Sequence, residues 1–174
     1  MRKGLYVLLL FLSFGVHTRA QTDALSDMEG LIQSQAAVMT SAFEERRFDL
    51  LLDYTYPMII TVAGGRDVLL QALTGMMLSM DSAGVRIDSV RVGTPGKIYA
   101  TGNEWHAIIP QYVYMTEPGD LRTKTTSYLL AITNNQGGRW YYMDTRQLTP
   151  ELKAAFFPQF NNDLIIPEAE VVTY

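Results

Sequence analysis

The chain contains no cysteine among its 174 residues. This absence excludes a thiol nucleophile, a thiolate metal site and a lipid anchor on cysteine. A domain of roughly 150 residues buries enough apolar surface to fold without disulfides, so the lack of cysteine is compatible with export. The sequence also has no Asn-x-Ser/Thr acceptor, and nothing in it therefore indicates glycosylation.

Histidine is also scarce, because only His106 remains beyond the first 20 residues. One histidine without cysteine is a poor start for a zinc site, and we expect neither a metal nor another cofactor. We expect His106 itself to lie at the surface or in an interface, on the side of the predicted sheet that faces away from the helices. The chain has no Gly-x-Ser-x-Gly elbow of a serine hydrolase, and Gly64-Gly65 lacks the Gly-Lys-Ser/Thr ending of a phosphate-binding loop.

Long hydrophobic runs are absent except at the start, where the basic residues Arg2 and Lys3 precede an apolar run over residues 5–16. This pattern, ending in a small residue at Ala20, is typical of a secretory signal peptide, and we expect cleavage after Ala20. The run is shorter than the ~20 residues of a membrane-spanning helix, although an uncleaved anchor is the alternative. The sequence thus predicts a leader over 1–20 and one exported domain over 21–174, periplasmic or secreted, without stable membrane insertion.

Positive charge is low in the predicted mature chain. Losing Arg2, Lys3 and Arg19 reduces the 14 basic residues to 11, against 18 acidic residues, for a net charge of −7. An acidic domain without a clustered basic face is a poor ligand for nucleic acid, and we expect no such partner.

The first half of the remaining chain has helical patterns over residues 23–48, 49–54 and 67–80, whereas 58–62 is ambiguous between strand and helix. The apolar residues of 67–80 form a wide face that includes Met76, Met77 and Met80. Such a methionine-rich face is usually core, but it also suits an adaptable ligand-lining surface.

The second half has strand patterns. Alternation changes phase near Asp88-Ser89, which predicts a bulge. Three further runs between residues 104 and 144 predict an antiparallel meander, in which Pro110 indicates an edge strand or a bulge. Thr149-Pro150-Glu151 predicts the start of a short C-terminal helix in an extension from about residue 146. The fold class is therefore α+β, with N-terminal helices packed on a strongly bent antiparallel sheet.

The pairing of the meander follows from its loops. If 117–120 is a four-residue loop and 134–138 a five-residue loop, Thr116 pairs with Leu121 and Thr133 with Arg139. One face then meets the helices and lines a ligand pocket, with these residues: Trp105, Ile109, Gln111, Tyr128, Leu130, Trp140, Tyr142 and Asp144. A slip of one residue in either loop would exchange the faces of one strand.

In this register Asp144 and Tyr128 lie opposite each other in apolar surroundings that suit a carboxylate acting as a general base, so these two are the catalytic candidates. Alternatively, Asp144 caps the C-terminal segment or meets solvent. The opposite face carries Tyr112, Tyr114, Leu129 and Tyr141 and is too apolar to be left wet, so we expect a second copy to cover it in a homodimer.

The order of elements, together with the stretch Gly138-Arg139-Trp140-Tyr141-Tyr142-Met143-Asp144, resembles the NTF2-like superfamily over residues 25–144. This cone-shaped α+β fold also hosts ketosteroid isomerase and SnoaL-type cyclases. The later Phe156-Phe157-Pro158 resembles an extension of exported bacterial members. The resemblance implies a pocket between the helices and the concave sheet, and homodimers through the sheet. It transfers no catalytic set to this chain.

Three hypotheses follow. The first is a non-catalytic exported domain that binds a small apolar or amphipathic ligand in the helix–sheet pocket, or a protein partner through the sheet. The second is an isomerase- or cyclase-like enzyme that uses Asp144 with Tyr128. The third is a structural dimerisation module whose pocket is filled by its own methionine and aromatic side chains.

Overall fold

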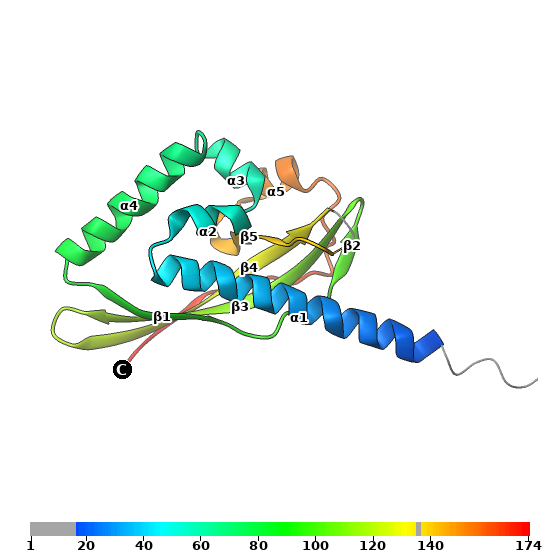
Figure 1. Ribbon diagram of the computed structural model, residues 1–174, viewed down its shortest axis with the longest axis horizontal. Helices are drawn as coiled ribbons and strands as arrows, with labels where there is room; N and C mark the ends of the chain where they lie inside the picture. Colours follow the sequence, from blue (N-terminus) through cyan, green and yellow to red (C-terminus); the bar gives the residue numbers. More distant parts are fainter. Residues whose placement is uncertain (1–16, 135–136) are drawn as a thin grey trace, which may run out of the picture.

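The computed structural model describes residues 17–134 and 137–174, with side chains described from Leu25 onward. The predicted leader thus lies mostly outside the described residues. The chain is an α+β protein in which helices precede an antiparallel sheet (Figure 1). Its elements are α1 (His17–Glu44), α2 (Phe48–Tyr54), α3 (Pro57–Val62), α4 (Arg66–Ser82), β1 (Arg86–Val92), β2 (Tyr99–Thr101), β3 (Glu104–Glu117), β4 (Leu121–Thr133), β5 (Tyr141–Asp144), the 3-10 helix η1 (Thr145–Gln147), α5 (Pro150–Phe156) and β6 (Glu170–Thr173).

The helix predictions are confirmed, and the ambiguous residues 58–62 belong to α3. Pro57 occupies the first turn of α3, where its missing N–H would have no partner within the helix in any case. At the other end of the chain, the Thr149 side chain accepts a hydrogen bond from the Leu152 N–H and starts α5. Proline in the first turn thus marks the start of α3, and a side-chain cap marks the start of α5.

The two long strands β3 and β4 form the middle of the sheet. Its order is β1-β3-β4-β5, while β2 pairs with the start of β3 and β6 with the start of β4. The predicted bulge is confirmed by a register shift in β1 between Ile87 and Ser89. It bends the strand where it passes over the end of the β3–β4 hairpin.

The prediction that Pro110 marks an edge strand is wrong for β3 as a whole, because β3 pairs with β4 along its full length. Proline is tolerated because β1 has already ended at Val92 on the other side of β3. There the Pro110 carbonyl accepts a hydrogen bond from the Gly93 N–H at 2.9 Å. The missing N–H of Pro110 therefore faces a connecting loop, and no ladder hydrogen bond is lost.

Both predicted hairpin registers are wrong by one residue. Glu117 pairs with Leu121, and Ala131 pairs with Tyr142. The two errors cancel for β3 and β5, whose faces are as predicted, but they exchange the faces of β4. As a result Leu129 and Ala131 face the helices, whereas Tyr128, Leu130 and Ile132 face the other side.

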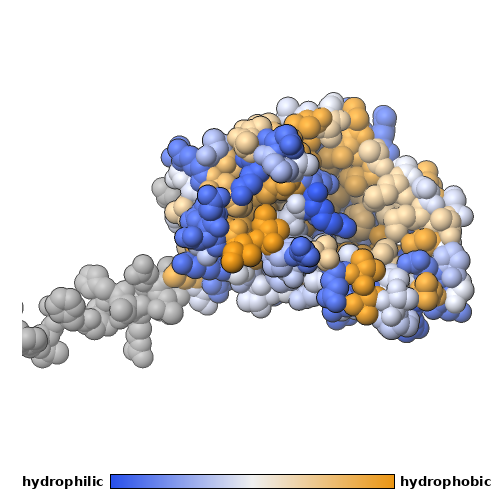
Figure 2. Space-filling view, turned by 180° about the vertical axis from the view of Figure 1, so that it is seen from behind, coloured by the Kyte–Doolittle hydropathy of each residue, from blue (hydrophilic) through white to orange (hydrophobic). Residues whose placement is uncertain are grey.

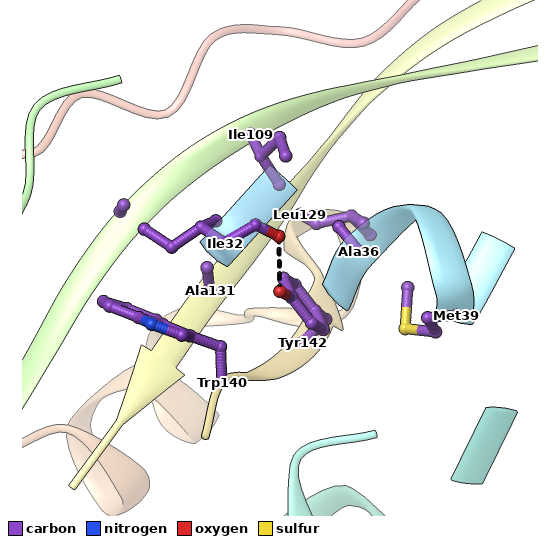
Figure 3. Packing of buried hydrophobic residues seen from close by; sticks show 9 residues of the cluster. Ile32, Ala36, Met39, Ile109, Leu129, Ala131, Trp140 and Tyr142 are labelled. Carbon is purple, nitrogen blue, oxygen red and sulfur yellow. Dashed lines mark hydrogen bonds between the residues drawn. The ribbon is translucent and has the colours of Figure 1, made fainter. Parts of the chain in front are cut away.

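The helix-facing core lies between α1, α2 and the sheet (Figure 3). Trp140 and Tyr142 are almost fully buried at its centre. The Tyr142 hydroxyl donates to the Ile32 carbonyl of α1 at 2.7 Å, and the Trp140 indole N–H donates to the Gly137 carbonyl at 3.1 Å. These bonds satisfy the polar atoms that the two large rings bring into the core. The buried members are Ile32, Ala36, Met39, Ala107, Ile109, Leu129, Ala131, Trp140 and Tyr142.

A second core covers part of the opposite face of the sheet. Here the segment after α5 folds back over β4 and β5, with α3 at the side. Its buried members are Leu130, Ile132, Met143, Phe157, Phe160 and Leu164. The sheet is thus covered on one face by helices and on part of the other by the C-terminal segment.

Candidate functional site

The structure separates the two catalytic candidates. Asp144 lies on the helix-facing side opposite Leu129, whereas Tyr128 lies on the other side of β4. The Asp144 carboxylate accepts hydrogen bonds from the Arg146 backbone N–H at 2.9 Å and from its guanidinium at 2.6 Å. Asp144 also caps η1. The alternative in which Asp144 caps the C-terminal segment is therefore confirmed, and this carboxylate is not placed to act with Tyr128 as a base.

The other predicted pocket residues are distributed over both faces. Ile109, Trp140 and Tyr142 are buried in the helix-facing core, with Trp105 packed at its margin. Gln111 is half-buried and accepts a hydrogen bond from the Ser127 hydroxyl. Leu130 belongs to the second core, because of the register error in β4. The helix-facing side chains Ile109, Trp140 and Tyr142 therefore fill the space in which a pocket was predicted.

The predicted interface residues also separate. Tyr112 and Tyr114 lie half-buried on the face away from the helices, where the Lys124 ammonium stands 4.8 Å from the ring centre of Tyr112. Tyr141 shares that face. Leu129 is the exception, because it is buried against the helices and cannot take part in an interface.

A different site appears along α4. Leu69, Leu73, Met76 and Met80 recur at steps of four, three and four residues and so share one face of this helix. None of them is buried, and Met76 is 41% exposed. Within α4, all of which the structure describes, Met77 is the only buried residue. The prediction that this face is ordinary core is therefore wrong for most of its length.

The face of α4 remains open because the helix stands away from the sheet. Its main contacts are with α2 and α3, and it runs above the half of the sheet that ends in the β3–β4 turn (Figure 1). Figure 2 shows a hollow in the surface beneath α4 with largely hydrophobic walls. We call this space the α4 hollow.

The sheet contributes hydroxyl groups to the side that faces the helices. The alternation that places Leu129 and Ala131 in the core continues to Ser127, Thr125 and Thr123, all of which are buried. The Thr123 hydroxyl is buried without a hydrogen-bond partner among the described residues. Buried hydroxyls are nearly always satisfied, so this unpartnered atom is an exception on the helix-facing side of the sheet.

A second concavity, with a volume of about 510 Å³, lies between α1 and β1. Its lining is mostly short or polar, and includes Gly30, Ser34, Ala37, Ser41, Glu44, Val90 and Arg91. The Glu44 carboxylate already accepts a hydrogen bond from the Val90 N–H of the edge strand β1. This groove therefore suits an apolar ligand less well than the α4 hollow.

His106 faces away from the helices as predicted, but the prediction that it lies at the surface or in an interface is wrong. Its side chain is fully buried beneath Phe157 and Phe160. The sequence did contain a signal, since an aromatic cluster after a proline-started helix needs an apolar face to cover. No pattern showed that this face would include His106.

Within the described residues, no group of three or more histidine or acidic side chains is placed to hold a metal ion. The helices that the structure describes include none with the length and apolar character needed to cross a bilayer. Comparisons with family models, with curated proteins and with solved structures gave no significant match. The class of this protein therefore rests on its architecture, an α+β protein with an antiparallel sheet and a partly open helix layer.

Proposed function

We propose that this protein binds a small apolar or amphipathic molecule, without chemical conversion, in the α4 hollow. The observation that carries the proposal is the uncovered apolar face of α4, on which Met76 is 41% exposed, above a surface that is hollowed beneath this helix (Figure 2). Burying such a face yields about 25 cal/mol per Å² of apolar area removed from water. Methionine side chains are flexible and polarisable, and they adapt to ligands of different shape.

The sheet side of the α4 hollow supports an amphipathic ligand in particular. The Thr123 hydroxyl is buried and unpartnered on the helix-facing side of the sheet, so a ligand that displaces the side chains covering it can offer the hydrogen bond that an entirely apolar molecule lacks. Binding without catalysis is the simpler reading, because the Asp144 carboxylate is engaged by Arg146 and Tyr128 lies on the other face.

We expect Met76→Lys to weaken ligand binding at least tenfold, because the substitution places an ammonium group in the apolar wall. Binding is measured by thermal shift and titration calorimetry, first with a panel of steroids, fatty acids and bile acids to find a ligand. The matched control is Leu78→Lys. Leu78 is 59% exposed and lies on the opposite side of α4, about 200° around the helix from Met76. A flat panel, or equal loss of affinity in both variants, contradicts binding in the α4 hollow.

A second candidate function is self-association through the sheet, for which the tyrosine-bearing strip beyond the second core is the specific support. The C-terminal segment covers the half of this face near β5, but Tyr112 and Tyr114 remain half-buried. Val172 of β6, which is 43% exposed, lies on the other side of Lys124 from Tyr114. An aromatic face of this kind is common in protein interfaces.

For this candidate we expect sedimentation of the protein as a dimer at micromolar concentration and of Tyr114→Glu as a monomer, since a charge in the middle of an apolar interface is costly. Leu78→Glu, on the far side of α4, serves as the control and remains dimeric. A monomeric parent protein would refute this function and leave the ligand-binding proposal intact.

We retain export and an NTF2-like cone as parts of the proposal. Cleavage after Ala20 would remove only the first four residues of α1, well ahead of Ile32, the first buried residue among the side chains of α1 that the structure describes. The order of helices before a bulged antiparallel sheet supports the cone, and the α4 hollow lies between helix and sheet, as a pocket of that fold would.

A further inference from the structure

His106 occupies an unusual position for the one histidine of the described side chains. Its side chain is fully buried, and its Nε2 lies 3.0 Å from Glu104 Oε2. Its Nδ1 is buried without a hydrogen-bond partner among the described residues. Neutral imidazole fits this arrangement when Nε2–H donates to Glu104, because Nδ1 then carries only a lone pair.

The C-terminal segment covers the side chain of His106. The ring of Phe157 stands edge-on at 5.1 Å between centres, and that of Phe160 lies at 5.7 Å. Between them, Gln159 lies directly on the β2–β3 turn, where a Cβ on Gly102 would come 2.1 Å from Gln159 Oε1. We call residues 157–164 the C-terminal clamp. Beyond it the chain continues to β6, whose four residues are all exposed.

Charged and titratable groups surround His106 from each neighbouring element. Glu104 lies on its own strand, and Tyr99 of β2 pairs directly with it. Tyr56, ahead of α3, donates its hydroxyl to Glu104 Oε1 at 3.4 Å, and burial followed by the Glu104 charge raises the pKa of Tyr56 to about 12. The ammonium of Lys153 stands 4.2 Å from the ring centre of Phe160, and that of Lys97 stands 5.0 Å from Tyr99. Glu104 thus contacts the imidazole directly, whereas the two ammonium groups lie against the neighbouring rings of Phe160 and Tyr99.

We propose that His106 is an acid-sensitive switch that holds the C-terminal clamp closed when neutral and releases it when protonated. A proton from solvent would have to bind Nδ1, which creates a buried cation whose new N–H has no acceptor. Opening of the clamp lets water reach this group. Release would uncover the second core and free β6, which is joined to the clamp and contributes no buried residue.

The direction of the pH effect follows from the pKa of His106. Burial lowers this pKa, and the hydrogen bond and charge of Glu104 only partly oppose the effect. In the open clamp the pKa returns to its ordinary value of about 6.5. The equilibrium constant for closing the clamp is therefore independent of pH well above pH 6.5. Below pH 6.5 this constant falls by up to tenfold per pH unit, until the pH reaches the pKa of His106 in the closed form.

The test is hydrogen–deuterium exchange of the full chain at pH 7.5 and pH 5.0, corrected for the intrinsic pH dependence of exchange. We expect protection of residues 156–166 and 170–173 to fall at least tenfold at pH 5.0 relative to peptides from β3 and β4. In His106→Gln, which keeps a polar side chain but does not titrate, the relative protection should not change with pH. Equal pH effects in both proteins would overturn the proposal, as would an unchanged clamp in the parent protein.

A second variant keeps the test decisive if His106→Gln does not fold. Glu104→Gln preserves an acceptor for Nε2–H but removes the charge that stabilises the imidazolium, so the pKa of the closed form falls further. We therefore expect the clamp of Glu104→Gln to open at least as much as that of the parent at pH 5.0, and equally little at pH 7.5. Less opening than in the parent at pH 5.0 would contradict the switch. Ligand binding in the α4 hollow is unaffected by either result.

Discussion

Trp140→Ala is expected to lower the free energy of unfolding by about 3–5 kcal/mol, the usual cost of truncating a buried aromatic residue. Trp140 is fully buried in the helix-facing core, and its indole donates the hydrogen bond to Gly137 that closes the turn before β5. Truncation leaves both a cavity and an unpaired carbonyl. Since total stabilities are about 5–15 kcal/mol, this single change removes a large share.

The measurement is urea denaturation followed by circular dichroism, with thermal unfolding as a check. For a chain of this size the expected loss corresponds to a fall in Tm of roughly 6–20 °C. The matched control is Trp105→Ala, because Trp105 is packed only at the margin of the same core. A cost in Trp140→Ala no larger than in Trp105→Ala would show that the helix-facing core does not depend on this ring.

The faces of the sheet show how far the sequence determines this fold. The alternation of side chains along a strand is a local property, so the sequence predicts which residues of one strand share a face. Which faces of neighbouring strands lie on the same side of the sheet depends on the lengths of the loops between them. Glu117 belongs to β3 and pairs with Leu121, so the β3–β4 loop holds three residues and not four. One residue reversed the predicted faces of β4 and moved Tyr128 away from Asp144.

The two errors also explain why most of the core was still predicted. The second hairpin was wrong by one residue as well, which restored the faces of β5 relative to β3. Trp140 and Tyr142 were therefore placed correctly among the helix-facing residues, although the predicted neighbours on β4 were not. The faces of β5 were thus predicted correctly because two register errors cancelled, although neither turn was predicted correctly.

The candidate site required information that the sequence does not contain. Periodicity identified the apolar face of α4 correctly, but periodicity cannot show what lies opposite a helix face. Whether Leu73 and Met76 meet a sheet or an open hollow depends on how α2 and α3 position α4. In the same way, alternation placed His106 on the far side of β3, but its burial depends on the distant Phe157 and Phe160.

The second large effect is expected for Phe157→Ala, which should lower the free energy of unfolding by about 3–5 kcal/mol at pH 7.5, where His106 is neutral. Phe157 is 3% exposed and joins three parts of the fold, because its ring lies 5.4 Å from Tyr56, 5.1 Å from His106 and 6.2 Å from Phe160. Truncation leaves a cavity among these three rings. We expect the loss to appear in urea denaturation together with faster exchange of residues 157–164.

Phe156→Ala is the matched control, since Phe156 adjoins Phe157 in sequence but is only half-buried. It should cost about 1 kcal/mol, near the centre of the distribution for single substitutions. If Phe157→Ala accelerates exchange in the C-terminal segment but leaves the denaturation midpoint unchanged, that segment opens as an independent unit and the global cost argued above is refuted. The acid-sensitive switch would survive that result, because it requires only that closure of the clamp is weaker than the fold it covers.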